Sequence, residues 1–230
     1  MSQNNYNIEH IIEALESRGF TNFISQKELR DIKGKLRKNE YVIYETHNES
    51  NKVILYKKNP PQIDLLKISN VDTLRHQDIL GTIYSLGIKD DTFGDIIKYE
   101  DSFYIFTIPS ISSYIIYNLD KIKNNYVEIT TEDIEISKNF IQDYIKKEII
   151  VSSLRLDNVL SSLINKSRND ISDIFKNKEV ILNYDDSIKP TRVLKEGDVF
   201  SVRRYGKFKY NRVLKTTKKG GFIIEILIYK

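Results

Sequence analysis

The sequence predicts an α+β protein of three successive segments, the last of which is strongly basic. Some stretches carry apolar residues at helical spacing. In others, apolar and polar residues alternate, or short apolar runs stand between residues that favour turns, and both patterns indicate strands. The pair Pro60-Pro61 interrupts the first of these patterns. Residues 1–150 have a net charge of −4, but residues 151–230 have 17 lysines and arginines against nine acids, a net charge of +8. A polyanionic partner for the last segment follows from this asymmetry.

Residues 1–61 are expected to form a small N-terminal α/β segment. Its first helix is predicted by apolar residues on one face: Ile8, Ile11, Ile12 and Leu15. A second helix is expected after Ser25, which has Glu28 three residues later, the spacing of a capping box. Two short strands, 41–46 and 52–57, flank a polar turn and complete the segment.

Residues 62–135 follow the order βαββαβ, which is the plan of ferredoxin-like and RNA-recognition folds. The expected elements are strand 63–68, helix 73–86, strands 95–99 and 103–108, helix 110–119 and strand 126–130. This segment has a net charge of −7. Its aromatic run Phe103–Phe106 contains no Lys or Arg, so we interpret it as core packing and not as a platform for RNA bases. A protein partner is the alternative for this domain, because the plan hosts many functions.

Residues 136–150 suggest a helical linker, and residues 151–230 a domain of two helices and a small antiparallel sheet. The first helix is predicted by Leu156, Val159, Leu160 and Leu163 at helical spacing. Ser167 caps the second helix, with Asp170 in the capping-box position. Strands are expected at 180–183 and 199–203, and a closing ribbon at 209–214 and 222–229.

Arg155 and Arg168 are the leading candidates for contacts with RNA, because each stands at a predicted helix start. A cation there opposes the helix dipole and costs about 0.3–1 kcal/mol, so folding alone does not favour it. Free backbone amides at the same end, together with an arginine fork, would bind a phosphate. The alternative is an arginine that is paired with a nearby carboxylate, such as Asp157 or Asp170.

Further basic residues extend this candidate RNA surface. They are Lys176, Arg203, Arg204, Lys207, Lys209, Lys218 and Lys219. Tyr205 and Phe208 stand among them and are suited either to base stacking or to packing within the sheet. Lys176, Lys218 and Lys219 have a simpler alternative role as solvated side chains that keep the protein soluble.

Several functional classes are disfavoured by what the sequence lacks. There is no Cys, which excludes disulfides, zinc–thiolate sites and thiol catalysis. The three His have no metal-ligand spacing, and no phosphate-binding loop, nucleophile elbow or dinucleotide fingerprint is found. We therefore expect a non-enzymatic protein with no metal and no cofactor. No signal peptide or membrane span is recognised, so a cytoplasmic protein that is monomeric when free is the expectation.

The C-terminal pattern resembles a known RNA-binding domain. The matching residues are Ser153–Asp157 with Leu160, Ser167-Arg168, Val180–Asn183 and Gly197–Val202, which together are similar to the S-four RNA-binding domain. Upstream, Leu74–Gly81, Leu86–Ile88, Gly94–Ile96 and Phe23–Glu28, with Thr217–Gly220 near the end, are similar to the bacterial YlmH-type proteins. That resemblance spans nearly the whole chain.

The resemblance implies an RNA-binding factor that docks on rRNA of the large ribosomal subunit and on tRNA. The family is linked to the rescue of stalled nascent chains that are still attached to tRNA, and Arg155 and Arg168 would contact the rRNA and tRNA backbones. Two alternatives remain open. One is an RNA-modifying enzyme with its active site in residues 1–135, for which His76 and Asp78 are the candidate polar groups. The other is a transcript-binding regulator linked to cell division.

Overall fold

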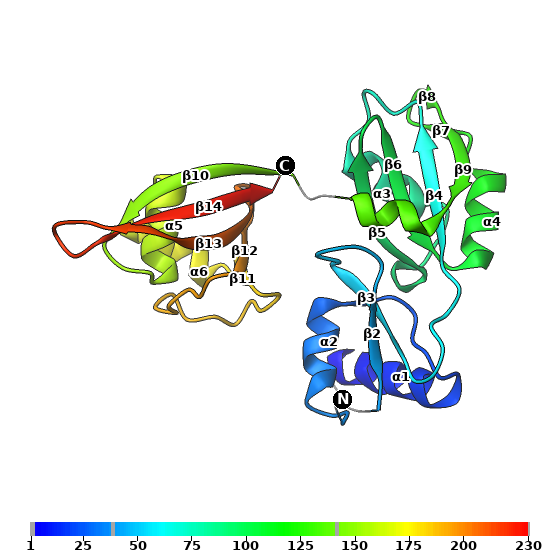
Figure 1. Ribbon diagram of the computed structural model, residues 1–230, viewed down its shortest axis with the longest axis horizontal. Helices are drawn as coiled ribbons and strands as arrows, with labels where there is room; N and C mark the ends of the chain where they lie inside the picture. Colours follow the sequence, from blue (N-terminus) through cyan, green and yellow to red (C-terminus); the bar gives the residue numbers. More distant parts are fainter. Residues whose placement is uncertain (1–2, 38–39, 141–142, 230) are drawn as a thin grey trace. The chain divides into compact units, whose positions relative to one another are not determined.

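The computed structural model describes residues 3–37, 40–140 and 143–229. The chain divides into two compact units, Met1–Ile141 and Gln142–Lys230 (Figure 1). Both units combine helices with antiparallel sheets, which confirms the α+β class. The predicted N-terminal segment and middle domain lie together in the first unit, and the basic domain forms the second.

The N-terminal segment packs two helices beside a three-stranded sheet. Its elements are α1 (Gln3–Ser17), β1 (Ile24–Ser25), α2 (Gln26–Lys33), β2 (Val42–Glu45) and β3 (Lys52–Tyr56), with strand order β1-β3-β2. The capping box predicted at α2 is confirmed, because the Ser25 side chain accepts from the Glu28 amide and the Glu28 carboxylate accepts from the Ser25 amide. Leu15, Leu29 and Ile32 fill the small core.

The middle domain has the predicted ferredoxin-like topology. Its elements are β4 (Asp64–Ser69), α3 (His76–Ser85), β5 (Phe93–Tyr99), β6 (Ser102–Thr107), α4 (Pro109–Asn118) and β9 (Glu128–Glu132), with the small hairpin β7 (Lys121–Ile122) and β8 (Asn125–Tyr126) and the 3-10 turns η1 (Asp90–Thr92) and η2 (Ile134–Asn139). The sheet order is β5-β6-β4-β9, and all three strand pairs are antiparallel. Inward residues of β4 and β6, such as Leu66, Ile68 and Ile105, pack with Ile79, Ile83 and Ile115 of the two helices.

The opposite face of this sheet is also covered, which confirms that Phe103–Phe106 is core. Tyr104 and Phe106 are 5% and 0% exposed. Phe140 packs on both rings, with centroid distances of 4.9 and 6.2 Å, and Phe23 of the N-terminal segment belongs to the same cluster. The face that RNA-recognition folds use for base stacking is therefore occupied by the protein's own side chains.

Polar contacts join the N-terminal segment to the middle domain. The Asp95 carboxylate accepts from the Asn51 amide (2.7 Å) and lies 2.8 Å from Nε2 of His47, whose side chain is 9% exposed. Lys52 donates to the Asp90 carboxylate at 2.9 Å. These bonds explain why the expected boundary at residue 61 does not separate two compact units.

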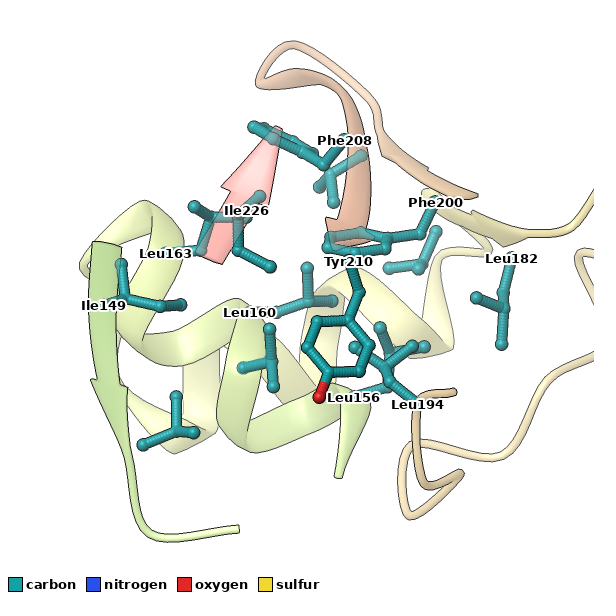
Figure 2. Packing of buried hydrophobic residues seen from close by; sticks show 14 of the residues in the cluster. Ile149, Leu156, Leu160, Leu163, Leu182, Leu194, Phe200, Phe208, Tyr210 and Ile226 are labelled. Atoms are coloured by element: carbon teal, nitrogen blue, oxygen red, sulfur yellow. The ribbon is translucent and has the colours of Figure 1, made fainter. Parts of the chain in front are cut away.

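The second unit places two helices on one face of a five-stranded sheet (Figure 1). Its elements are β10 (Tyr144–Val151), α5 (Leu156–Ile164), α6 (Arg168–Lys176), β11 (Val180–Leu182), β12 (Val199–Val202), β13 (Gly206–Thr216) and β14 (Phe222–Tyr229), in the order β10-β14-β13-β12-β11. Figure 2 shows Leu156, Leu160 and Leu163 of α5 converging on Phe200, Phe208, Tyr210 and Ile226 of the sheet. The apolar stripe read from the sequence is thus the face of α5 that enters the core.

The predicted helical linker at 136–150 is wrong. Residues 134–139 form η2, residues 141 and 142 lie outside the described part, and residues 144–151 form the edge strand β10. β10 pairs along its whole length with β14, more than 70 residues later. Ile149 and Val151 are buried whereas Ile150 is exposed, which is the period of a strand. A short apolar run does not reveal a partner so distant in sequence, and this is why the local pattern misled.

Candidate nucleic-acid interface

A cavity of about 340 Å³ lies in the basic domain beside α5 and α6. We call it the α5–α6 cavity. It is lined by Ser152, Ser153, Arg155, Asp157, Asn158, Ser161, Arg168, Ile171, Ser172, Phe175 and Pro190. The structure therefore brings Arg155 and Arg168, which were singled out separately from the sequence, to one concave site.

Arg155 occupies the N-cap position of α5 and is paired with Asp157. Nε and Nη2 of the guanidinium donate to the two carboxylate oxygens at 3.2 and 2.6 Å. This hydrogen-bonded pair raises the pKa of the Arg155 guanidinium. The ion pair that the sequence left open as an alternative is thus formed, and it offsets the positive charge at this side of the cavity.

The start of α5 does not offer the free amides that the sequence suggested. The amide of Leu156 donates to the carbonyl of Arg192 at 2.8 Å, and the amide of Asp157 donates to the carbonyl of Pro190 at 3.0 Å. The loop that contains Pro190 and Arg192 therefore closes this helix end, so that expectation is corrected. Sequence could not show it, because the loop lies more than 30 residues further along the chain.

The start of α6 is open. Ser167 and Asp170 form the predicted capping box, and hydrogen bonds from Ser167 hold the pKa of the Asp170 carboxyl below its ordinary value. Since that carboxylate is engaged by Ser167, the alternative pairing of Arg168 with Asp170 is not formed. Arg168 is exposed, and neither its guanidinium nor the amides of Arg168 and Asn169 have a partner among the described residues. A cation and free amides coincide here, which is the arrangement that binds an anion.

The other predicted cations do not all lie on one surface with the cavity. Arg203 and Arg204 stand in the turn before β13, whereas Lys218 and Lys219 stand in the turn after it. Those two turns are separated by the 11 residues of β13, roughly 35 Å of extended strand. The predicted nine-residue surface is thus spread over several sides of the domain.

Lys176, Arg203, Lys207 and Lys209 lie at different places in the domain. Lys176 ends α6 and pairs with Asp173 at 3.0 Å, with both side chains exposed. The Arg203 amide donates to the carbonyl of Glu179, which places that turn near the end of α6. Lys207 and Lys209 lie on the sheet face away from the helices, because their neighbours Phe208 and Tyr210 point into the core. RNA contact by each of them remains a prediction.

The turn between β13 and β14, which carries Lys218 and Lys219 and which we call the lysine turn, lies on the cavity's side of the domain. Val151 pairs with Phe222, and a Cβ added at Gly221 would come within 2.8 Å of the Val151 carbonyl oxygen. Ser152 and Ser153, which follow directly, line the cavity. Lys218 and Lys219 are exposed at the tip of that ribbon. They are the predicted cations best placed to add charge beside the α5–α6 cavity.

The two aromatic candidates behave differently. Phe208 is 4% exposed and stacks on Phe200 with a centroid distance of 5.6 Å, so it packs within the sheet. Tyr205 is 41% exposed in the turn and retains a face toward solvent. Only Tyr205 of this pair is available for stacking on a base.

Most residues of the cavity wall were not predicted from the sequence, although the helical spacing of several of them indicates a shared face. Arg168, Ile171, Ser172 and Phe175 are spaced i, i+3, i+4 and i+7, which places them on one face of α6. Asn158 and Ser161 are likewise one turn apart on α5. Pro190 comes from a distant loop, and only the tertiary fold brings it to the site.

The first unit shows a structural role for Asp78, one of the residues of the enzyme alternative. Its carboxylate accepts from the Arg75 amide at 3.0 Å and pairs with Lys123 at 2.6 Å. The side chain is 7% exposed. Asp78 therefore caps α3 and anchors the segment that holds β7 and β8.

Two parts of the chain are similar to known protein families. Residues 62–138 match the family described as "Putative RNA-binding domain in YlmH", and residues 145–205 match "Mitochondrial transcription rescue factor 1, C-terminal domain". A curated relative, "Ribosome-associated protein quality control protein P2" of Bacillus subtilis (strain 168), is 27% identical over 154 residues. The match covers 63% of this chain and 56% of the relative's length.

The chain is similar to YlmH-type proteins over residues 62–138. The resemblance drawn from the sequence is thereby confirmed. A solved structure, "Cell division protein ylmH from Streptococcus pneumoniae", is 20% identical with a TM-score of 0.47, and the match covers 59% of this chain and 92% of that one. Residues 62–138, which match the family "Putative RNA-binding domain in YlmH", contain the middle sheet, one face of which is covered by the protein's own side chains. Within the described ranges, no helix has the length and apolar character needed to cross a membrane.

Proposed function

We propose that this protein is a non-enzymatic RNA-binding factor whose C-terminal domain grips structured RNA at the α5–α6 cavity. One observation carries the proposal: Arg168 stands exposed at the open start of α6, without a partner in the described parts of the chain, on a domain of net charge +8. Folding alone does not favour a cation at this position. A phosphate there would satisfy both the guanidinium and the free amides.

The target in this proposal is the large ribosomal subunit together with tRNA. The support is the Bacillus subtilis relative, whose name describes a ribosome-associated quality control protein. Within that pathway the protein would bind stalled complexes whose nascent chain is still attached to tRNA, and it would act in the cytoplasm. The acidic first unit would orient the basic domain or contact a protein.

The test is in-cell ultraviolet crosslinking of the tagged, full-length protein, followed by sequencing of the bound RNA. We expect the signal to concentrate on large-subunit rRNA and on tRNA. Arg168→Ala should reduce that signal, whereas Arg37→Ala, which removes an exposed arginine from the first unit, should leave it unchanged. A signal spread over mRNAs would contradict the ribosomal target and favour the transcript-binding alternative. No signal above background would reject RNA binding itself.

A further inference from the structure

We propose that the α5–α6 cavity receives a single unpaired nucleotide, so that the protein selects structured RNA with a looped-out or bulged base over a continuous duplex. This inference rests on the proposed RNA-binding function and adds the class of RNA feature that the site recognises. It is carried by the volume of the cavity, by its mixed lining and by the scatter of the remaining cations.

The volume suits one nucleotide. At about 340 Å³ the cavity falls at the lower end of the range, roughly 300–1,000 Å³, in which proteins bind small molecules. A paired duplex presents a convex backbone and keeps its bases stacked inside, so it would contact the rim and leave the cavity unfilled. An unpaired nucleotide can leave its stack and enter a hollow of this size.

The lining matches the chemistry of a base with its sugar and phosphate. Ile171, Phe175 and Pro190 contribute apolar surface for the faces of a ring. Ser152, Ser153, Asn158, Ser161 and Ser172 contribute hydroxyl and amide groups for base edges and ribose hydroxyls. Arg168 lies on the same wall and supplies a cation for the adjoining phosphate. A site for phosphate alone would not need the apolar wall.

Asn158 is positioned by the protein before any RNA arrives. Its Nδ2 donates to the carbonyl of Ser153 at 2.9 Å and lies 3.3 Å from the Ser153 hydroxyl. Its carboxamide oxygen has no partner within the described ranges, so it is left to accept a hydrogen bond. An exocyclic amino group on a base edge is a donor of the required kind.

The distribution of the other cations also favours recognition of an unpaired nucleotide over recognition of a continuous duplex. Lys207 and Lys209 face away from the helices, and Arg203 and Arg204 lie at the far end of β13 from the lysine turn. A rigid duplex on the helix side could not reach all of these charges at once. A duplex docked at the cavity would therefore contact only some of the cations, and discrimination falls to the nucleotide inside the cavity.

The test uses the full-length protein and two RNA hairpins with the same stem, one continuous and one with a single-nucleotide bulge. Ser172→Phe fills the cavity from α6 without changing any charge, and Ser162→Phe places the same side chain on the exposed side of α5, outside the cavity. Fluorescence anisotropy measures the affinities of wild type and both variants for the two hairpins, six in all, at fixed salt. Wild-type protein and Ser162→Phe should bind the bulged hairpin about tenfold more tightly, as expected for one stacked base.

Ser172→Phe should lose that preference and bind both hairpins as wild type binds the continuous one. If circular dichroism shows that this variant is unfolded, Ser152→Phe, which fills the cavity from the segment between β10 and α5, takes its place. Equal, salt-sensitive binding of both hairpins by wild type would overturn this inference and leave the proposed function standing. Failure to bind either hairpin even at low salt would overturn both.

Discussion

Arg155 holds the carboxylate of Asp157 through two hydrogen bonds of 3.2 and 2.6 Å, and both residues line the α5–α6 cavity. The cation that marks the helix start is therefore paired with an acid two positions later. Arg168, on the other helix of the same cavity, has no such partner within the described ranges. The two arginines that look equivalent in the sequence are unequal as RNA ligands.

Asp157→Asn should increase RNA affinity. The change removes a negative charge beside the bound RNA and releases the Arg155 fork, and the expected gain in affinity is about two- to fivefold, as for a partly exposed ion pair. The measurement is fluorescence anisotropy with a structured RNA at fixed salt. Asp173→Asn is the matched control, because it releases Lys176 outside the cavity and should change affinity less. Equal effects of the two variants would show that only net charge matters.

Arg168→Ala should weaken RNA binding by about 1–3 kcal/mol, because a charge-assisted contact is lost. It should also lower the slope of log affinity against log salt by about 0.9, the value for one phosphate contact with a duplex. Arg168→Lys should recover the salt slope but only part of the affinity, since a lysine cannot reproduce the fork. The fold should be unaffected, because the side chain is exposed. Unchanged affinity for Arg168→Ala would remove this residue from the site.

Gly94→Ala should destabilise the first unit. A Cβ at Gly94 would lie 2.7 Å from a ring carbon of Phe23 and 3.1 Å from Cβ of Phe106, both buried, so the cost should be about 1–3 kcal/mol. Gly81→Ala is the control: it lies in α3 with nothing within 4 Å and should stabilise by roughly 0.5–1 kcal/mol. Denaturant unfolding of each variant measures its free energy of unfolding, which should fall for Gly94→Ala and rise for Gly81→Ala. A neutral Gly94→Ala would mean that the N-terminal segment does not pack closely at this point.

Asp78 should make the stability of the first unit depend on pH. The Lys123 ammonium and the Arg75 amide hold the pKa of the Asp78 carboxyl below its ordinary value in the fold. A carboxyl whose pKa is lower folded than unfolded contributes stability at neutral pH, and this contribution is lost as the pH falls through the folded pKa. The free energy of unfolding of Asp78→Asn should therefore lie below that of wild type at pH 7 and converge with it in acid. Asp72→Asn, which removes an exposed carboxylate nearby, is the control and should change the free energy of unfolding at pH 7 less than Asp78→Asn does.

Local signals predicted much of this protein correctly because their causes lie within a few residues. The capping boxes at Ser25 and Ser167 formed as expected, since each needs only a hydroxyl and an acid three residues apart. The stripe of Leu156, Leu160 and Leu163 became the buried face of α5 for the same reason. The βαββαβ order likewise predicted the middle sheet, because short connections restrict how such elements can pair.

The sequence by itself determined the helices and strands outside residues 136–150, the basic character of the last domain and the positions of Arg155 and Arg168 at helix starts. Only the tertiary structure decided that residues 144–151 form a strand, that the loop near Pro190 closes the start of α5, and that the cations divide among different sides of the domain. The first two of these outcomes depend on partners more than 30 residues away. Hydrogen bonds and ion pairs across such separations are formed by the folded chain, and no local pattern of residues specifies them.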